Sequence, residues 1–385
     1  MRVYPPQMYS YSGKSSVDIV ISGGGTGGHI HPAVAIAETL KQIVPELRIA
    51  FVGNINGPEA RIIPQYGFPF YAISVSGFPR RWTWQWGSVI LKLATSLVQT
   101  FKLFQKLTPR IVIGTGGYVS GPVLLAARLN QIPIILQEQN AIPGLTNRFL
   151  ANFVKVAYLG LQTAHLHFPS VGITTGNPVR DEITRPPKKN DKLYHKYSLL
   201  PNMKTIFVMG GSQGATAVNQ LVMETMKKIS SSNTFDGFQI IHQTGQRDNE
   251  IVNDFYQNRP HILASVKPYF NQIEEVYALS DLLICRAGGS TVSEITACGI
   301  PAVLVPRPSS DNHQYHNAKV LSSAQAAVIR KQNKTDPKEL LETICNLLSN
   351  DELLLQMRAN SFRIGKPNAS QEIARSILEH IDYQI

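Results

Sequence analysis

The segment Val17–His29 reads VDIVISGGGTGGH and decides the fold. Its first part, Asp18–Ser22, has the composition of a buried strand, and the glycine-rich stretch Gly23–His29 follows directly. Glycine permits positive φ and lets a ligand come close to the backbone. A helix behind such a loop supplies N–H groups and a positive dipole end, which suit phosphate oxygens. The segment therefore predicts a Rossmann-like strand–loop–helix unit that binds a phosphate-bearing ligand.

Three further junctions repeat this pattern. Each follows a short apolar run and is rich in small residues: Gly114–Tyr118, Gly210–Gly214 and Ala287–Thr291. One glycine-rich turn is about as often a packing feature as a ligand loop, but four of them in two halves of the chain favour binding. Ligands of open α/β sheets collect at the carboxyl ends of the strands, where these loops lie.

Short apolar runs alternate with helix-length segments along the chain, as in parallel βαβ units. We therefore predict an α/β fold of two Rossmann-like domains that face each other across a cleft. The predicted strands are Asp18–Ser22, Arg48–Val52, Tyr71–Val75, Ile111–Ile113, Ile134–Leu136, Val156–Tyr158, Thr205–Met209, Gln239–Gln243, His261–Ala264, Leu282–Cys285 and Ala302–Val305. Predicted helices include Pro32–Ile43, Ala215–Ser230 and Thr291–Cys298.

The chain of 385 residues is long enough for two such domains. Proline and charge interrupt the pattern from Gly176-Asn177-Pro178 to Lys189, which marks the joint. We expect a polar extension at residues 1–16, an N-terminal domain at 17–178 and a C-terminal domain at 179–365. A final helix, Ala369–Ile381, lies within residues 366–385, a segment that is able to return to the first domain.

Composition excludes several classes of protein. With 43% apolar and 16% charged residues the chain is not disordered, and its three cysteines fit neither a disulfide framework nor a metal-ligand spacing. No apolar run reaches the roughly 18 residues of a membrane-spanning helix. The net charge of +11 is uneven, because residues 1–178 hold 14 Lys/Arg and only 5 Asp/Glu. The first half should therefore meet nucleic acid or an anionic membrane.

Two alternatives are weakened by specific residues. Gly23–Gly28 contains the G-x-G-x-x-G spacing of dinucleotide-binding enzymes, but Ile49–Gly53, where an acidic ribose ligand is expected, holds no acid. A nucleic-acid-binding protein would explain the basic half, but no recognition motif accompanies it.

The last loop supplies its own acid, since Thr291-Val292-Ser293-Glu294 opens the following helix. Glu294 could complement the helix dipole or accept both hydroxyls of a ribose.

At these loops the sequence becomes similar to a known family. It resembles the MurG family of peptidoglycan glycosyltransferases, which add N-acetylglucosamine to an undecaprenyl-pyrophosphoryl-muramoyl-peptide lipid, and the resemblance runs from about Val17 to the end. The motifs that carry it are Gly25–His29, Gly116–Pro122, Gln137–Asn140, Gly176–Arg180, Gly210–Ala215, Thr291–Glu294 and Gln314–Ala318. The resemblance implies two Rossmann-like domains of the GT-B type and an inverting transferase that needs no cofactor.

The resemblance also implies site residues. Glu294 should hold the uridine ribose, Ser212 the diphosphate, and the backbone at Phe270 the uracil, while Gln314 and Asn317 would contact the GlcNAc hydroxyls. The stretch Gly289, Ser290, Thr291, Val292 and Ser293 would line the nucleotide, and Thr26, Gly27, Gly28, Asn140 and Arg180 would complete the UDP-GlcNAc site from the other face of the cleft.

The acceptor hydroxyl needs a base, and two residues compete for that role. His29 has a suitable intrinsic pKa at the mouth of the first loop, and Glu138 is its rival, unless Glu138 only buttresses the loop around it. His29 and His31 form an H-x-H pair, but no further His, Cys or Asp cluster accompanies them, so we expect no metal. The acceptor side should include Gly116, Gly117 and Tyr118.

Residues 78–86 place all three tryptophans of the chain beside two arginines. Together with the resemblance, this run predicts that Arg80, Arg81, Trp82, Trp84 and Trp86 contact an anionic membrane surface. The apolar stripe that follows could instead pack on its own sheet. The expected location is peripheral, on the cytoplasmic face of the bacterial inner membrane, with other cell-wall synthesis or division proteins as further partners and no nucleic acid.

The sequence departs from the family pattern at two places in the donor site. Gly289-Ser290 replaces a bulkier apolar pair, and His313 stands where a glutamine is common.

A related two-domain transferase that acts on another lipid, such as diacylglycerol, is the alternative function.

Overall fold

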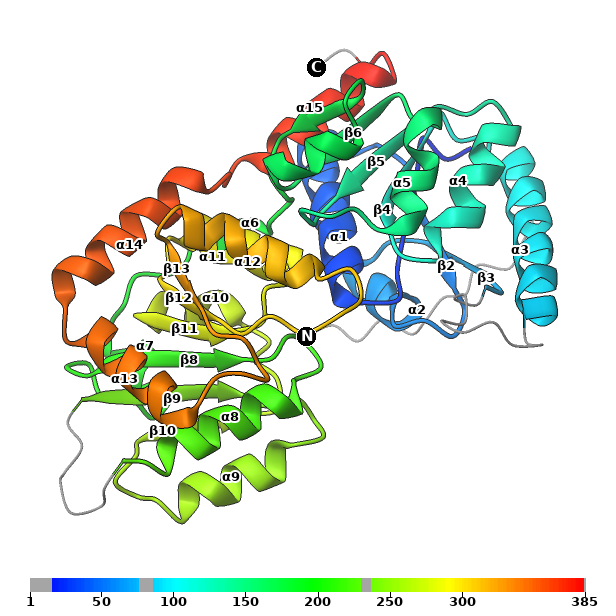
Figure 1. Ribbon diagram of the computed structural model, residues 1–385. Coiled ribbons are helices and arrows are strands. Elements are labelled where there is room, and N and C mark those ends of the chain that lie inside the picture. Colours follow the sequence, from blue (N-terminus) through cyan, green and yellow to red (C-terminus); the bar gives the residue numbers. More distant parts are fainter. Residues whose placement is uncertain (1–15, 76–85, 230–236, 384–385) are drawn as a thin grey trace. The chain divides into compact units, whose positions relative to one another are not determined.

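The computed structural model describes residues 16–75, 86–229 and 237–383. It consists of two compact units, the first formed by residues 1–179 and 368–385 and the second by residues 180–367. Each unit holds one parallel sheet with helices around it (Figure 1). The α/β fold class with two Rossmann-like domains is therefore confirmed.

The first unit contains a seven-stranded sheet in the order β3-β2-β1-β4-β5-β6-β7, as far as the described residues go. Its strands are β1 Ile19–Gly23, β2 Ile49–Asn54, β3 Phe70–Ile73, β4 Ile111–Gly116, β5 Ile134–Glu138, β6 Val156–Leu159 and β7 Gly172–Thr174. Its helices are α1 Gly27–Ile43, α2 Glu59–Ile62, α3 Trp86–Leu107, α4 Ser120–Leu129, α5 Leu145–Leu150 and α15 Ala369–His380, with 3-10 helices η1 Ile63–Tyr66, η2 Ala151–Phe153 and η3 Gln162–His167.

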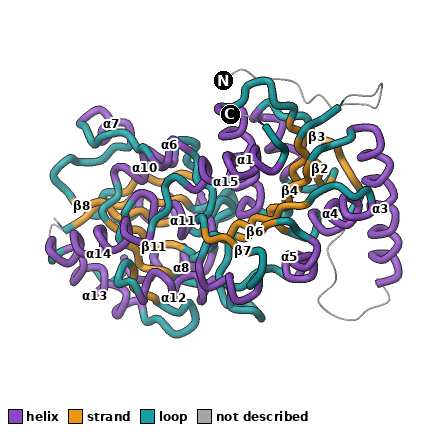
Figure 2. Tube along the Cα trace, turned by 90° about the horizontal axis from the view of Figure 1, so that it is seen from above, coloured by secondary structure: helices purple, strands orange, loops and turns teal. Residues whose placement is uncertain are grey.

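Apolar residues on both faces of this sheet are buried, as expected for parallel strands covered on both sides. One face packs against α1, η1 and α15, and the other packs against α3, α4 and α5. Figure 2 shows the strands between these two sets of helices. The last helix of the chain is part of this core, since Ile373, Ile377 and Leu378 are fully buried with residues of α1.

The second unit contains a six-stranded parallel sheet in the order β10-β9-β8-β11-β12-β13, again within the described residues. Its strands are β8 Lys204–Met209, β9 Phe238–Gln243, β10 Ala264–Lys267, β11 Leu282–Cys285, β12 Ala302–Leu304 and β13 Ala327–Ile329. Its helices are α6 Asp181–Thr184, α7 Asp191–Lys196, α8 Thr216–Met226, α9 Asn249–Gln257, α10 Ile273–Leu279, α11 Gly289–Cys298, α12 His313–Ser323, α13 Pro337–Leu348 and α14 Asp351–Ile364.

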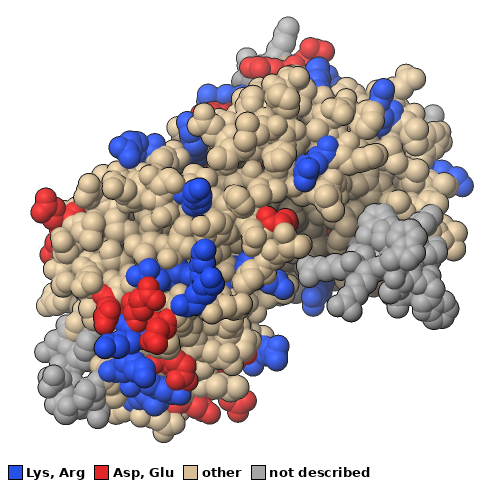
Figure 3. All heavy atoms as spheres, viewed as in Figure 1, with Lys and Arg blue, Asp and Glu red and all other residues tan. Residues whose placement is uncertain are grey.

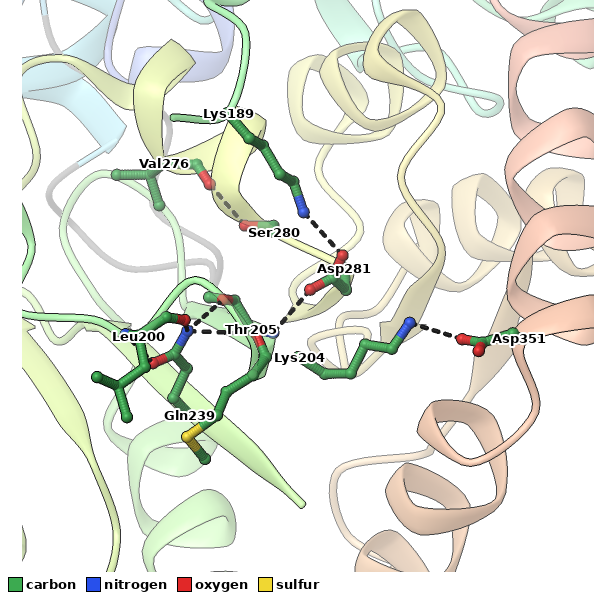
Figure 4. Close-up of polar contacts among 10 residues, drawn as sticks. Lys189, Leu200, Lys204, Thr205, Gln239, Val276, Ser280, Asp281 and Asp351 are labelled. Carbon is green, nitrogen blue, oxygen red and sulfur yellow. Dashed lines mark hydrogen bonds and ion pairs between the residues drawn. The ribbon is translucent and has the colours of Figure 1, made fainter. Parts of the chain in front are cut away.

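Polar contacts fix the amino ends of the central strands in the second unit (Figure 4). Asp281 accepts a hydrogen bond of 2.8 Å from the Thr205 N–H and forms an ion pair of 2.8 Å with Lys189. The Gln239 amide binds both the N–H and the carbonyl of Leu200. These contacts lie at the amino ends of the strands, opposite the glycine-rich loops at the carboxyl ends. Structural contacts and ligand-facing groups therefore lie at opposite ends of the strands.

Most predicted strands occur at the expected positions, and the errors concern the sheet edges. The strand predicted at His261–Ala264 is wrong, because β10 begins at Ala264, and β7 and β13 were not predicted. These edge strands are short and partly exposed, so they lack a long apolar run. The helix predicted from Pro32 begins earlier, at Gly27, so the glycine-rich loop itself forms the helix N-terminus.

The burial of α15 leads to a prediction. Ile377→Ala should destabilise the first unit by about 3 kcal/mol, because it leaves a cavity in a packed core. Urea unfolding followed by circular dichroism measures this. Arg375→Ala changes an exposed residue of the same helix and serves as the control. Equal unfolding midpoints for the two variants would show that the helix does not stabilise the unit.

Candidate active site

The loop after β1 meets the loop after β4 by direct backbone contact. Gly117 has φ of +83°, and a Cβ on it would lie 2.3 Å from the Gly24 carbonyl oxygen. The Gly24 N–H also donates to the Gly116 carbonyl at 3.4 Å. Thr26 is the N-cap of α1, so Gly27 and Gly28 form its first turn beside this contact. Only glycine fits at position 117, and the two loops therefore form one rigid edge.

His29 lies in that first turn with its ring held by two acceptors. Its Nδ1 is 3.0 Å from the Thr115 carbonyl oxygen and 2.9 Å from Gln139 Oε1. A carbonyl oxygen only accepts, so Nδ1 carries the proton in the neutral ring. The lone pair is then on Nε2, and the side chain is partly exposed. His29 is thus oriented as a proton acceptor through Nε2.

Glu138, the other candidate base, ends β5 and is almost fully buried. Its Oε1 accepts from the Asn140 backbone N–H at 2.9 Å and from the Asn140 amide at 3.1 Å. Its Oε2 accepts from the Gly144 N–H at 3.2 Å and from Asn147 Nδ2 at 2.8 Å. Four donors occupy this carboxylate, which favours the buttressing role over proton abstraction.

A second buried carboxylate supports the first loop, and the sequence did not indicate it. Glu59 begins α2, and its two oxygens accept from the N–H groups of Gly25 and Asn54 at 3.0 Å each. The Asn54 amide donates to the Tyr118 hydroxyl at 3.2 Å. The Gly25 N–H is therefore already engaged, which is a further reason why this loop differs from a dinucleotide site. The only signal in the sequence is that Glu59 is the last acid before a long acid-free stretch.

In the second unit, the loop after β8 contacts the loop after β9 in a similar way. Gly214 has φ of +78°, and a Cβ there would lie 2.1 Å from the Thr244 carbonyl oxygen. Ser212 is exposed in the same loop, ahead of α8. The buried Gln243 amide donates to the Gly211 carbonyl at 3.2 Å and accepts from the Phe270 N–H at 3.0 Å. Gln243, unnoticed in the sequence, thus joins the expected diphosphate and uracil segments.

The last glycine-rich loop leads into α11, which begins at Gly289 with Gly288 as N-cap. Ser290, Thr291 and Val292 follow in its first turn, and the Val292 N–H donates to the Gly288 carbonyl at 2.9 Å. The Ser293 hydroxyl donates to the Gly289 carbonyl at 3.1 Å and so faces its own helix.

Two side chains support this loop through hydrogen bonds. The Asn317 amide donates to the Ala287 carbonyl at 3.0 Å. Arg286 is buried and donates to Val305 O at 2.9 Å and to Gln332 Oε1 at 2.6 Å. Desolvation and the nearby charge of Arg307 lower the pKa of Arg286 to about 10.

Glu294 receives a hydrogen bond of 2.7 Å from the Tyr277 hydroxyl. Burial raises the pKa of Glu294 above its usual value, although the Tyr277 bond and the Arg180 charge act in the opposite direction. Arg180 belongs to the second unit and also acts on the pKa of Tyr269. We expected it with the groups of the other face, and this expectation is corrected: its charge lies beside Glu294.

The expected sugar contacts lie at the start of α12. Gln314 Oε1 accepts from the Arg307 N–H at 2.9 Å. His313, the departure from the family pattern, pairs through Nδ1 with Asp311 at 2.8 Å. Although partial burial opposes it, hydrogen bonds from Ser309 and His313 lower the pKa of Asp311 to about 2.

The predicted membrane contacts belong to the segment before α3 and to its first residue. Arg80, Arg81, Trp82 and Trp84 lie outside the described residues, as does the side chain of Trp86, which begins α3. Within the described part of the chain, no helix combines the length and hydropathy needed to cross a bilayer. The same residues hold no group of three or more His, Cys, Asp and Glu side chains placed to bind a metal ion.

Comparisons with known proteins identify the family. Residues 19–159 match the glycosyltransferase family 28 N-terminal domain, and residues 205–375 match the family 28 C-terminal domain. A relative from Halothermothrix orenii, named UDP-N-acetylglucosamine–N-acetylmuramyl-(pentapeptide) pyrophosphoryl-undecaprenol N-acetylglucosamine transferase, is 39% identical over 93% of this chain and 98% of its own. A relative of the same name from Desulforamulus reducens is 36% identical over 93% of this chain and 97% of its own.

Among solved structures, MurG from Acinetobacter baumannii is similar, with a TM-score of 0.74 and 30% identity over 94% of this chain and 99% of that one. The matches in sequence and structure extend over both units. The chain therefore belongs to glycosyltransferase family 28 and, within it, to the MurG family of N-acetylglucosamine transferases.

Proposed function

We propose that this enzyme transfers N-acetylglucosamine from UDP-GlcNAc to a muramoyl-(pentapeptide) pyrophosphoryl-undecaprenol lipid, with inversion at the anomeric carbon. The substrates follow from the names of its relatives, which span nearly the whole chain. The observation that carries the mechanism is the orientation of His29, whose Nδ1–H is held by two acceptors while Nε2 remains the acceptor atom.

His29 is the general base in this proposal. Its Nε2 removes the proton of the acceptor hydroxyl as that oxygen attacks the anomeric carbon, and the bond to the UDP oxygen breaks in the same displacement. Thr115 and Gln139 stabilise the imidazolium that forms, because both accept from Nδ1–H. Glu138 positions Asn140 and Asn147 and takes no proton, since four donors already saturate it.

The second unit binds the donor. The Glu294 carboxylate accepts hydrogen bonds from the ribose hydroxyls. Ser212 and the backbone N–H groups at the start of α11 bind the diphosphate. As UDP leaves, negative charge grows on its oxygens, and Arg180 with these N–H groups stabilises that charge. Phe270 offers its backbone to the uracil, and Gln314 faces the sugar. The expected sugar contact of Asn317 is not retained, because this residue is fully buried and its amide supports the loop at Ala287.

Transfer to diacylglycerol, the alternative, has no support among the relatives described above, which are both named for the muramyl lipid. Incubation of the protein with labelled UDP-GlcNAc and either acceptor tests this directly. We expect a disaccharide lipid with the linkage opposite in configuration to the donor, formed from the muramoyl lipid alone. Product from diacylglycerol instead would contradict the proposed substrate.

We also propose that the first unit docks on the anionic cytoplasmic surface of the inner membrane. On the face drawn in Figure 3, most Asp and Glu side chains gather on the second unit. Leu145, Phe149 and Phe153, at α5 and η2 of the first unit, recur every four residues and are exposed by 82%, 70% and 44%. The exposed cations Arg148 and Lys155 lie in the same segment.

A hollow of about 380 Å³ adjoins this apolar segment. Arg128, Phe153 and Lys155 line it, and the Arg128 guanidinium lies 6.0 Å from the Phe153 ring centre. Cations beside exposed aromatic rings suit a phosphate headgroup above acyl chains. This surface supports the membrane proposal independently of the tryptophan run.

The base assignment leads to a prediction. His29→Ala should lower kcat by roughly 10²–10⁴-fold and leave the KM for UDP-GlcNAc nearly unchanged, because it removes proton transfer and not donor contacts. Steady-state kinetics with both substrates measures this. His31→Ala removes a histidine from the same helix turn and should affect kcat far less. A His29→Ala enzyme with wild-type kcat and pH profile would exclude His29 as the base.

The membrane proposal leads to another. The double variant Phe149→Ser/Phe153→Ser should bind vesicles of anionic phospholipid about tenfold more weakly, since two apolar side chains no longer enter the interface. Sedimentation with vesicles measures this, and UDP binding should not change. Leu355→Ser, at an exposed apolar residue of the second unit, is the matched control. Unchanged binding of the double variant would locate the membrane contact elsewhere.

A further inference from the structure

A buried phenol contacts the Glu294 carboxylate. Tyr277, on α10, donates its hydroxyl proton to Glu294 Oε2 at 2.7 Å, and its side chain is only 2% exposed. We propose that Tyr277 is a positioning residue of the donor site, which holds the Glu294 carboxylate ionised and directed at the donor ribose. This rests on the proposed function, because it assumes that Glu294 binds the nucleotide.

The Tyr277 ring is fixed by aromatic contacts that continue to the uracil segment. It meets Phe207 of β8 edge to face, with ring centres 5.9 Å apart, and Phe207 meets Phe270 in the same manner at 6.2 Å. Phe270 in turn contacts Tyr197 at 5.8 Å. T-shaped pairs of buried rings have well-defined geometry. The hydroxyl of Tyr277 therefore has a fixed direction relative to Phe270, whose segment we assign to uracil binding.

Several neighbouring groups interact electrostatically with Glu294. The titratable side chains that act on it or respond to its charge are Tyr277, Tyr269, Cys285 and Cys298. Burial raises the pKa of each of these four groups, so they remain neutral at working pH. The cation acting on Glu294 is Arg180. Tyr277 donates a hydrogen bond of 2.7 Å to the carboxylate.

The direction of a pH effect follows. An ionised carboxylate can accept from both ribose hydroxyls, so donor affinity is present above the pKa of Glu294 and is lost as the pH falls through it. Burial already raises the pKa of Glu294. Loss of the Tyr277 hydroxyl removes a hydrogen bond that favours the charged form, so the pKa rises further.

Tyr277→Phe tests this in the full-length protein. Titration of UDP by calorimetry between about pH 5 and pH 9 should show the loss of affinity at a pH about one unit higher than in the wild type. Near pH 9 the two proteins should bind UDP within about twofold of each other. A residue with a merely structural role would change the melting temperature and leave the midpoint of this pH profile unchanged.

Tyr256→Phe is the matched control. It removes another buried hydroxyl of the second unit, one that pairs with His242 Nδ1 at 3.2 Å, and it should leave the pH midpoint of UDP binding unchanged. In a Glu294→Gln background, Tyr277→Phe should have no further effect on UDP affinity, because the group through which it acts no longer titrates.

The outcomes separate the two claims. Weak UDP binding by Glu294→Gln together with a wild-type pH profile for Tyr277→Phe would overturn the role of Tyr277 and leave the donor site in place. Wild-type UDP binding by Glu294→Gln would overturn the assignment of the ribose contact itself. A shifted midpoint in Tyr277→Phe that vanishes in the double variant supports both.

Discussion

Contact between backbones at the carboxyl ends of adjacent strands is the constraint on which both candidate half-sites depend. In the first unit the Cα of Gly117 lies against the Gly24 carbonyl, and in the second the Cα of Gly214 lies against the Thr244 carbonyl. No side chain fits between these loops. Their N–H groups are therefore placed by strand spacing and not by flexible side chains, which lowers the reorganisation needed when charge develops on a ligand.

Buried carboxylates then divide the loops by function. In the first unit, Glu59 and Glu138 each accept hydrogen bonds from loop N–H groups and so support the loops of the acceptor side. In the second unit, Glu294 accepts a hydrogen bond from the phenol of Tyr277 and interacts with the charge of Arg180. A carboxylate that accepts from several loop donors serves as structure, whereas Glu294 accepts from a phenol and, in the proposed function, from the donor ribose. This difference, more than the glycine pattern, separates the two halves chemically.

The sequence predicts those parts of the molecule whose cause is local. Buried strands such as β1 and β8 leave continuous apolar runs, and tight turns leave glycines, so the fold class and all four loops follow from composition. Edge strands are different: β10 carries partly exposed residues, and its predicted position was shifted toward the more apolar residues before it. An edge strand is defined by its neighbour in the sheet, which a local pattern does not contain.

The same reasoning explains which site residues were missed. Glu59, Gln243 and Tyr277 act through partners 17 to 34 positions away, and nothing near them in the sequence marks the contact. His29 and Glu294 were found because each lies in a helix that directly follows a glycine-rich loop, His29 in the first turn of α1 and Glu294 further along α11. The tautomer of His29, in contrast, depends on Thr115 and Gln139 and required the folded structure.

The return of α15 to the first unit has a consequence for biosynthesis. The second unit is continuous, from residue 180 to 367, whereas the first needs residues 368–385 to complete its core. A ribosome releases the chain from its N-terminus, so every segment of the second unit has emerged before the first unit obtains its last helix. Until then the buried face of α1 lacks Ile373, Ile377 and Leu378 and remains partly open to water. The domain that is synthesised first is thus the last to be finished.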